Sequence, residues 1–204
     1  MRLPKFASKL LAITAMTLLI GTPAQAGLQD RDLNGDGVTD AFYDTDLNIT
    51  WLRNANVNGL MTWAAANTWA AGLSIGVYSG WRLPTSDTCS EFNCTASETG
   101  HLIYTELGNS AFWLSNPGGF QNLRSDNYWT STEQAANSTN AWYFLVGDNR
   151  QNAVDKSATM YAMAVRPGDV APVPEPEIYA TLLAGLGLVG VMSRRRTTKR
   201  CVEI

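Results

Sequence analysis

Histidine is almost absent from this chain, because His101 is the single histidine in 204 residues. A zinc site that needs two histidines, such as the H-E-x-x-H motif, is therefore excluded. The chain also contains no phosphate-binding P-loop. No pair of carboxylates stands at a spacing that indicates acid–base chemistry. The sequence therefore predicts a protein that is not an enzyme.

Basic residues are scarce in the central part of the chain. Residues 27–177 contain 7 Lys or Arg against 17 Asp or Glu, a net charge of −10, although the whole chain sums to −3. A nucleic-acid partner requires a basic patch, so this balance excludes nucleic acid as a partner. All seven Trp lie in this part, which favours one folded domain with a real core.

The first 26 residues have the features of a secretory signal peptide. A basic start is followed by a short apolar stretch, Leu10 to Ile20, and then by Ala24-Gln25-Ala26 directly before Gly27. Small residues in this pattern are typical of a signal-peptidase cleavage site. We expect residues 1–26 to be removed by a cut between Ala26 and Gly27.

The last part of the chain, residues 173–200, has three features in a fixed order. Pro174, Glu175 and Pro176 lie in a linker, 170–177, whose prolines favour extended backbone. Residues 178–193 are uncharged and apolar, and would form a helix of about 24 Å, somewhat short for a transmembrane helix of roughly 20 residues. A basic cluster then follows at Arg194, Arg195 and Arg196. Such a cluster stays on the cytoplasmic side, which predicts a transmembrane helix with the domain outside.

These features together resemble the PEP-CTERM sorting signal of Gram-negative bacteria, with Pro174, Glu175, Pro176 and Arg194 to Arg196 as the matching residues. The resemblance implies that an exosortase cuts the chain near Pro-Glu-Pro. It also implies that residues 178–193 hold the chain in the inner membrane only transiently. The cell surface or the extracellular biofilm matrix is then the expected destination. An ordinary single-pass membrane anchor is the alternative.

Two of the three cysteines, Cys89 and Cys94, lie close together in a polar stretch. Disulfides persist in the oxidising compartments that an exported protein enters, so we predict a disulfide that closes a small loop. On the chain-entropy model, closing this loop stabilises the domain by roughly 2 kcal/mol. Free thiols are one alternative. A metal site is another, although it would need more ligands than the sequence offers here.

Residues 27–42 form an acidic segment with the start of a calcium-binding loop. Oxygen ligands stand at positions 1, 3, 5, 7 and 9 of such a loop, from Asp32, Asn34, Asp36, the carbonyl of Val38, and Asp40. Tyr43 occupies position 12, where an EF-hand has a bidentate Glu. We therefore expect weak calcium binding, on the order of 10⁻⁴ to 10⁻³ M. An acidic leader that binds no ion is the alternative.

From residue 43 onward, the pattern predicts an α+β fold with an antiparallel sheet. Thr62 is expected to cap a helix over residues 63–73, and a second helix is expected over 100–107, ended by Gly108. Extended segments are expected at residues 49–52, 81–85, 128–131, 141–146 and 160–165.

Six short motifs follow one another through residues 43–169: Thr50-Trp51-Leu52, Met61-Thr62-Trp63-Ala64, Trp81-Arg82-Leu83-Pro84-Thr85, Tyr128-Trp129-Thr130-Ser131-Thr132-Glu133, Ala141-Trp142-Tyr143-Phe144 and Ala164-Val165-Arg166-Pro167-Gly168. In this order they resemble the Lcl_C domain, the C-terminal domain of a secreted collagen-like adhesin. The resemblance implies a C-type-lectin-like fold with two helices, a small twisted sheet and long loops. It also implies a role in adhesion or in binding polysaccharide. The Glu-Pro-Asn, Gln-Pro-Asp and Trp-Asn-Asp motifs of calcium-dependent lectins are absent, so their sugar-coordinating site is not carried over.

Trp81, Trp129 and Trp142, with Arg82 beside the first of them, are the residues that we consider for sugar binding. Aromatic faces suit sugar rings, whereas burial in the core is the alternative for each tryptophan. The alternative for the arginine is a structural ion pair.

Other polar residues are expected to have structural roles. Arg82 and Arg166 are predicted to pair with Glu133 or Asp169, and His101 is predicted to be exposed or to cap a helix.

The sequence therefore predicts an exported, exosortase-processed module that binds surface polysaccharide without catalysis. A structural matrix protein without a specific ligand is one alternative, and an enzyme that acts on exopolysaccharide is another.

Overall fold

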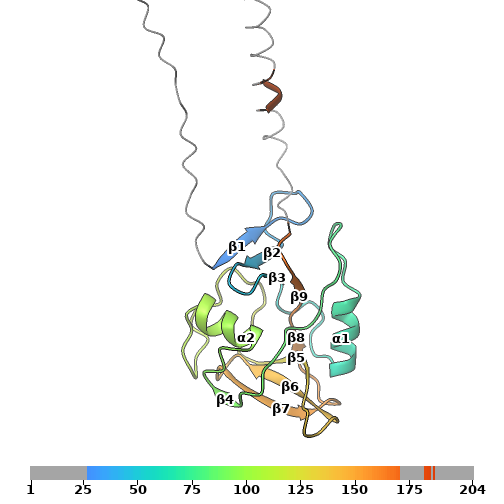
Figure 1. The fold of residues 1–204 in the computed structure, drawn as a ribbon, viewed down its shortest axis with the longest axis vertical. Helices are drawn as coiled ribbons and strands as arrows, with labels where there is room; N and C mark the ends of the chain where they lie inside the picture. Colours follow the sequence, from blue (N-terminus) through green and yellow to red (C-terminus); the bar gives the residue numbers. More distant parts are fainter. Residues whose placement is uncertain (1–26, 171–181, 185, 187–204) are drawn as a thin grey trace, which may run out of the picture.

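The computed structural model describes residues 27–170, 182–184 and 186 (Figure 1). Several predicted segments lie outside these residues: the signal peptide 1–26, the Pro-Glu-Pro of 174–176, most of the expected transmembrane segment 178–193, and the arginines at 194–196. Within the described residues, no helix is long and apolar enough to cross a membrane.

The first sheet contains four antiparallel strands in the order β1-β2-β3-β9. Their bounds are β1 (Leu28–Arg31), β2 (Ala41–Asp44), β3 (Ile49–Leu52) and β9 (Val165–Pro167). The acidic segment 27–42 thus supplies β1 and the first residues of β2. Because β9 comes from the far end of the domain, this sheet joins the beginning and the end of the folded region.

The second sheet has the strand order β4-β7-β6-β5-β8, and only β5 and β8 are parallel. Its strands are β4 (Glu91–Phe92), β5 (Asn127–Glu133), β6 (Asn140–Leu145), β7 (Arg150–Asp155) and β8 (Tyr161–Ala162). One strand predicted over 160–165 is wrong, because the chain leaves one sheet after Ala162 and enters the other at Val165. Met163 and Ala164 make this crossing inside the core, where both are buried.

The helix α1 (Trp63–Ala71) confirms the first helical prediction and ends two residues earlier than expected. Thr62 caps it, since its Oγ1 accepts a hydrogen bond from the N–H of Ala65 at 3.4 Å. Ala66 and Ala70, one turn apart, are the buried residues of this helix. Their small side chains let the helix pack closely on the sheet that contains Trp129.

The second helical segment begins at α2 (Glu98–Gly100) and continues as a π-helix, η1 (His101–Glu106). It starts two residues before the predicted position because Ser97, not Gly100, supplies the cap. The N–H of Leu107 donates to the carbonyl of Leu102 at 2.9 Å, a five-residue step. A π-helix has a wider turn than an α-helix, so residues five apart lie near one face.

The main core lies between the two sheets and the second helical segment. Trp51, Leu102, Ile103, Phe144 and Val165 are all fully buried there. Because adjacent elements share these side chains, the two sheets and both helices form one packed domain.

Candidate functional site

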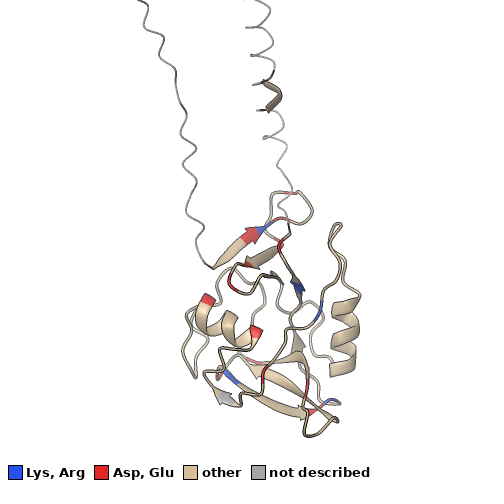
Figure 2. Cartoon of the chain, in the orientation of Figure 1, with Lys and Arg blue, Asp and Glu red and all other residues tan. Residues whose placement is uncertain are grey.

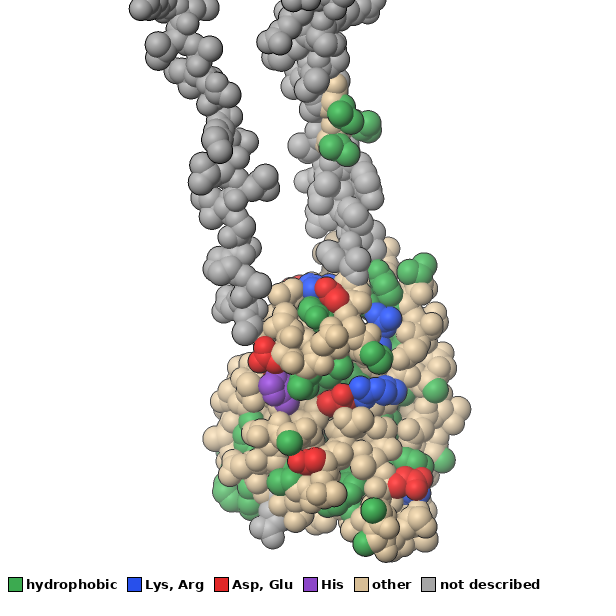
Figure 3. Space-filling view, viewed as in Figure 1, with side chains coloured by type: hydrophobic (Ala, Val, Ile, Leu, Met, Phe, Trp, Pro, Cys, Tyr) green, Lys and Arg blue, Asp and Glu red, His purple; other side chains and the backbone are tan. Residues whose placement is uncertain are grey.

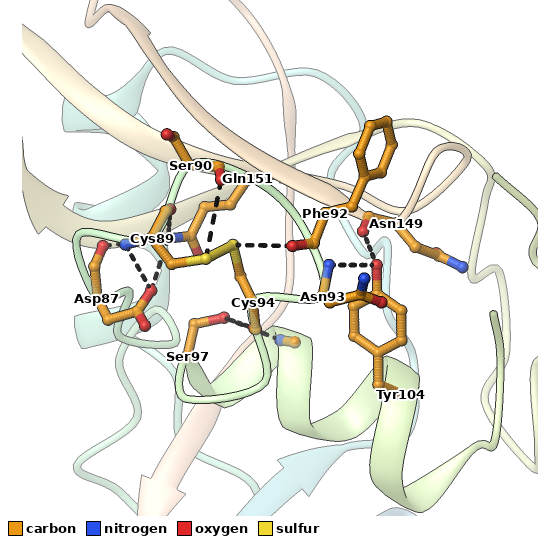
Figure 4. The surroundings of a disulfide bond; sticks show 11 residues. Asp87, Cys89, Ser90, Phe92, Asn93, Cys94, Ser97, Tyr104, Asn149 and Gln151 are labelled. Carbon is orange, nitrogen blue, oxygen red and sulfur yellow. Dashed lines mark hydrogen bonds between the residues drawn. A yellow bond between two sulfur atoms is a disulfide. The ribbon is translucent and has the colours of Figure 1, made fainter. Parts of the chain in front are cut away.

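Cys89 and Cys94 form the predicted disulfide, which confirms that interpretation over free thiols or a metal site (Figure 4). The loop is tied to β7 through Gln151, whose Nε2 donates to the carbonyl of Cys89 at 2.7 Å and to Oδ1 of Asp87 at 2.9 Å. The hydroxyl of Ser97 donates to the carbonyl of Cys94 at 3.1 Å. The disulfide therefore fastens the loop between the second sheet and the second helical segment.

Replacing both Cys89 and Cys94 by Ser is expected to lower the free energy of unfolding by roughly 2 kcal/mol, because the unfolded chain gains the freedom of an open loop. Urea unfolding measures this loss. Reduction of the wild-type protein is the matched control and is expected to give the same loss. Equal stability of the oxidised protein and the double variant would contradict the prediction.

Phe92, inside this loop, contacts Phe112, which is followed in the chain by Trp113, and we call Phe92, Phe112 and Trp113 the aromatic tip. The rings of Phe92 and Phe112 lie 4.4 Å apart between centroids. Phe112 is 63% exposed and Trp113 is 70% exposed. Large rings held at this exposure offer a stacking surface to a ligand.

The turn that carries Phe112 and Trp113 is held in place by the turn between β6 and β7. The side-chain amide of Asn149 donates to the carbonyls of Ser110 and Trp113. The N–H of Phe112 donates to the carbonyl of Asp148 at 2.9 Å. Phe112 has φ +70°, a conformation that is unfavourable for a bulky residue. The surroundings thus hold two adjacent aromatic residues outward in a strained turn, which is a feature of binding sites.

A pocket of about 380 Å³ lies at the paired strands β4 and β7 and reaches the aromatic tip at Phe92. It is lined by Ser90, Phe92, Arg150, Gln151 and Asn152. Polar groups beside exposed rings can hydrogen-bond to a ligand that stacks on those rings. In Figure 1, β4 and β7 lie at the end of the domain opposite to β1.

None of the expectations from the sequence concerned the aromatic tip. A signal was present, because Phe112 and Trp113 are adjacent aromatic residues in a stretch rich in Gly, Asn and Ser. Two neighbouring side chains in such a loop rarely point into the same core.

The sugar-binding interpretation of Trp81, Trp129 and Trp142 is wrong for this structure, because all three are at least 92% buried. The indole N–H of Trp129 donates to the carbonyl of Met61 at 2.9 Å. The structure therefore supports the alternative, in which these residues belong to the core.

Arg82 has the expected structural role but another partner. Its guanidinium donates to both carboxylate oxygens of Glu98 at 2.7 Å. The predicted partners are engaged elsewhere, since Glu133 pairs with Lys156 and Asp169 pairs with Arg31. Arg166 donates to the carbonyls of Ser79 and Asp169.

The predicted calcium loop is a run of short-range turns in which side-chain oxygens accept backbone N–H groups. The carboxylate of Asp32 accepts hydrogen bonds from the backbone N–H groups of Asn34, Gly35 and Gly37. Desolvation acts to raise the pKa of Asp32, but the N–H groups of Gly37 and Gly35 outweigh it and lower the pKa below its ordinary value.

The rest of the loop fits calcium only in part. Asn34 accepts from Asp36, and Asp36 accepts from Val38. The carboxylate of Asp40 accepts a hydrogen bond from the N–H of Leu33. The ring of Tyr43, at position 12, lies under the guanidinium of Arg31. Calcium binding at these residues stays a prediction.

Four titratable side chains meet at the other end of the domain, and we call Asp44, Asp46, His101 and Glu106 the His101 cluster. Nε2 of His101 lies 3.2 Å from Oε1 of Glu106 and 4.0 Å from an oxygen of each aspartate. The side chains of Asp44, Glu106 and His101 are 0%, 4% and 15% exposed. Figure 3 shows the histidine beside an acidic side chain at this surface.

The expectation that His101 is exposed is therefore wrong, although His101 does stand at the C-terminal cap position of α2. The π-helix is the physical reason, because its wider turn brings residues 101 and 106 to one side. Burial and the charge of Asp44 raise the pKa of Glu106, although His101 acts in the opposite direction. The carboxylates of the His101 cluster thus have too little positive charge near them to compensate their negative charges.

Asp44, His101 and Glu106 each offer one ligand atom, and these three atoms lie within 4.8 Å of one another. That spacing is close enough for them to hold one metal ion. Asp44 is poorly suited to this role. Its Oδ1 already accepts from the N–H groups of Asp46 and Leu47 at 3.1 and 2.9 Å, and its Oδ2 accepts from the indole of Trp51 at 3.4 Å. Two hydrogen bonds use both lone pairs of the oxygen that faces the histidine.

Comparison with known protein families gives two matches. The model of the Lcl C-terminal domain matches residues 40–166, and the PEP-CTERM protein-sorting motif matches residues 172–196. Both resemblances drawn from the sequence are thereby confirmed. The sorting motif marks the chain as exported and as processed by an exosortase. No curated protein matches the chain.

Proposed function

The chain belongs to the Lcl C-terminal domain family, and on this premise we propose that it is a non-catalytic adhesion module that binds neutral polysaccharide through its aromatic tip. The observation that carries this proposal is the outward display of Phe112 and Trp113 beside a polar pocket. Sugar rings present C–H faces that stack on aromatic rings, and their hydroxyl groups suit the side-chain amide of Asn152, which is exposed.

The charges of the domain favour a neutral ligand over a sulfated one. Lys and Arg are dispersed over the described residues instead of forming a patch (Figure 2). Each of these seven residues has a carboxylate, a carbonyl or an aromatic ring as its partner: Arg31, Arg53, Arg82, Arg124, Arg150, Lys156 and Arg166. A sulfated chain would have to compete for cations that are already engaged.

The position of the aromatic tip suits a surface protein. The sorting motif follows the domain, and the domain ends near β1 and β9, whereas β4 lies at the opposite end (Figure 1). A protein that is held through its C-terminal side would present the aromatic tip outward. We therefore place the protein at the cell surface or in the extracellular matrix, and we propose that its two helices and two small sheets form a C-type-lectin-like fold.

Affinity electrophoresis of the exported protein in gels that contain dextran, a β-glucan or dextran sulfate tests this proposal. We expect retardation by a neutral polysaccharide and about 5-fold weaker binding for Trp113→Ala, since one aromatic contact contributes about 1 kcal/mol. Val77→Ala is the matched control, because Val77 is also an exposed apolar residue, 88% exposed, outside the aromatic tip.

Three results would contradict the proposal. Binding that is unchanged in both Trp113→Ala and Phe112→Ala would place the ligand elsewhere. Absence of retardation by every polysaccharide would favour a structural matrix protein without a specific ligand. Release of reducing sugar during the assay would instead favour the enzymatic alternative.

A further inference from the structure

We propose that the His101 cluster binds the ammonium group that signal cleavage creates at Gly27. The ligand is thus the mature amino terminus of the chain itself. This inference rests on export and on the predicted cut before Gly27, and it is independent of polysaccharide binding.

Gly27 lies directly against the His101 cluster. Its N–H donates to Oγ1 of Thr45 at 3.0 Å, and its carbonyl accepts from the N–H of Thr45 at 3.3 Å. A Cβ atom added at Gly27 would lie 3.2 Å from Oε2 of Glu106. Ordinary bond lengths then place the nitrogen of Gly27 within about 6 Å of that oxygen.

Within residues 27–170, no Lys or Arg forms an ion pair with a carboxylate of the His101 cluster, and His101 is the one basic side chain that pairs with them. Three carboxylates face one imidazole, so net negative charge remains whatever charge His101 carries. Buried carboxylates are costly unless a cation compensates them. The raised pKa of Glu106, caused by burial and by Asp44, is the direct sign of this deficit.

Signal cleavage supplies such a cation at this place. Hydrolysis of the Ala26–Gly27 bond by a peptidase consumes one water, leaves a carboxylate on Ala26, and leaves an ammonium group on Gly27. The nitrogen changes from a neutral amide with one N–H to a cation with three. It can keep its hydrogen bond to Thr45 and direct a further N–H toward Glu106.

An ammonium ion fits the His101 cluster better than a metal ion does. It requires no ligand from Asp44, whose oxygens already accept backbone and indole hydrogen bonds. The glycine at position 27 is consistent with this proposal, because a side chain there would crowd Glu106 and because the backbone has φ +131°. Glycine is the residue that allows this approach.

The test compares two forms of the exported chain in thermal unfolding at pH 7. One form begins at Gly27 with a free amine, and the other carries an N-terminal acetyl group. The α-amino group has an ordinary pKa of about 7.7 to 8.0, so it is mostly charged at this pH. We expect the free amine to raise the melting temperature by about 4 °C.

Two variants show whether the His101 cluster causes this difference. In Glu106→Gln, which keeps the shape but removes the charge, we expect the difference between the two forms to disappear. Glu133→Gln is the control, because it removes an exposed carboxylate that pairs with Lys156. In this variant we expect the difference in melting temperature between the two forms to persist. Reductive methylation of the α-amine gives a second readout, and we expect it to be slower in the wild-type protein than in Glu106→Gln.

The proposal is wrong if acetylation leaves the melting temperature unchanged, or if the same difference persists in Glu106→Gln. It is also wrong if EDTA lowers the melting temperature of the wild-type protein but not of Glu106→Gln. That result would mean that the His101 cluster holds a metal ion.

Discussion

Gly100→Ala is expected to destabilise the domain by at least about 3 kcal/mol. A Cβ atom at this position would overlap the carbonyl oxygen of Cys94 and would lie 2.7 Å from Oγ of Ser97. Neither group can move away easily, because Cys94 is held by the disulfide and Ser97 caps the helix. Since domains are stable by only about 5 to 15 kcal/mol, such a loss prevents stable folding or comes close to doing so.

Thermal and urea unfolding of Gly100→Ala measure this effect, and Gly108→Ala is its matched control. Gly108 ends the same helical segment, and a Cβ atom there would meet no atom within 4 Å, although its φ is +63°. We expect the free energy of unfolding of this control to fall by only about 1 kcal/mol, because alanine is less favourable than glycine in this backbone conformation. If both variants lose the same amount, the disulfide loop does not pack on the helix as described.

Trp129→Ala is expected to lower the free energy of unfolding by about 3 to 5 kcal/mol. The side chain is fully buried between α1 and the second sheet, where it contacts Ala66 and Ala70. Its removal leaves a large cavity, and it also leaves the carbonyl of Met61 without the indole N–H. Circular dichroism during urea unfolding measures the loss.

This variant also distinguishes the two interpretations that the sequence left open for the tryptophans. Trp129→Phe is the control, since it fills most of the space and loses the indole hydrogen bond. We expect Trp129→Phe to fold and to bind polysaccharide like the wild type, because the core position has no contact with a ligand. Normal stability of Trp129→Ala together with lost binding would instead restore the sugar-stacking role.

Elements with a strong local signal were predicted from the sequence. Thr62 with the residues that follow it specifies α1, because an N-cap and the small residues Ala66 and Ala70 act within a few turns. The strand at 49–52 was found from its β-branched and aromatic residues. The cysteine pair was predicted from its spacing together with export.

Elements that depend on a remote partner were missed. The strand β7 reads Arg-Gln-Asn-Ala-Val-Asp, which has no strand pattern of its own, and it forms because it pairs with β6 and β4. β1, with the sequence Leu-Gln-Asp-Arg, likewise depends on β2. The segment 160–165 was read as one strand because its apolar run continues across two sheets.

The sequence by itself determined that this protein is exported and which family it belongs to. Both depend on linear features, namely a Pro-Glu-Pro with its basic end and six motifs in order. Only the tertiary structure decided which side chains are available for binding. Packing buries Trp81, Trp129 and Trp142 and leaves Phe112 and Trp113 exposed. The His101 cluster joins residues 44–46, at the end of β2, to residues 101–106, and a π-helix turns His101 and Glu106 to one side. Such proximity is set by the folding of the whole domain, so no local pattern in the sequence records it.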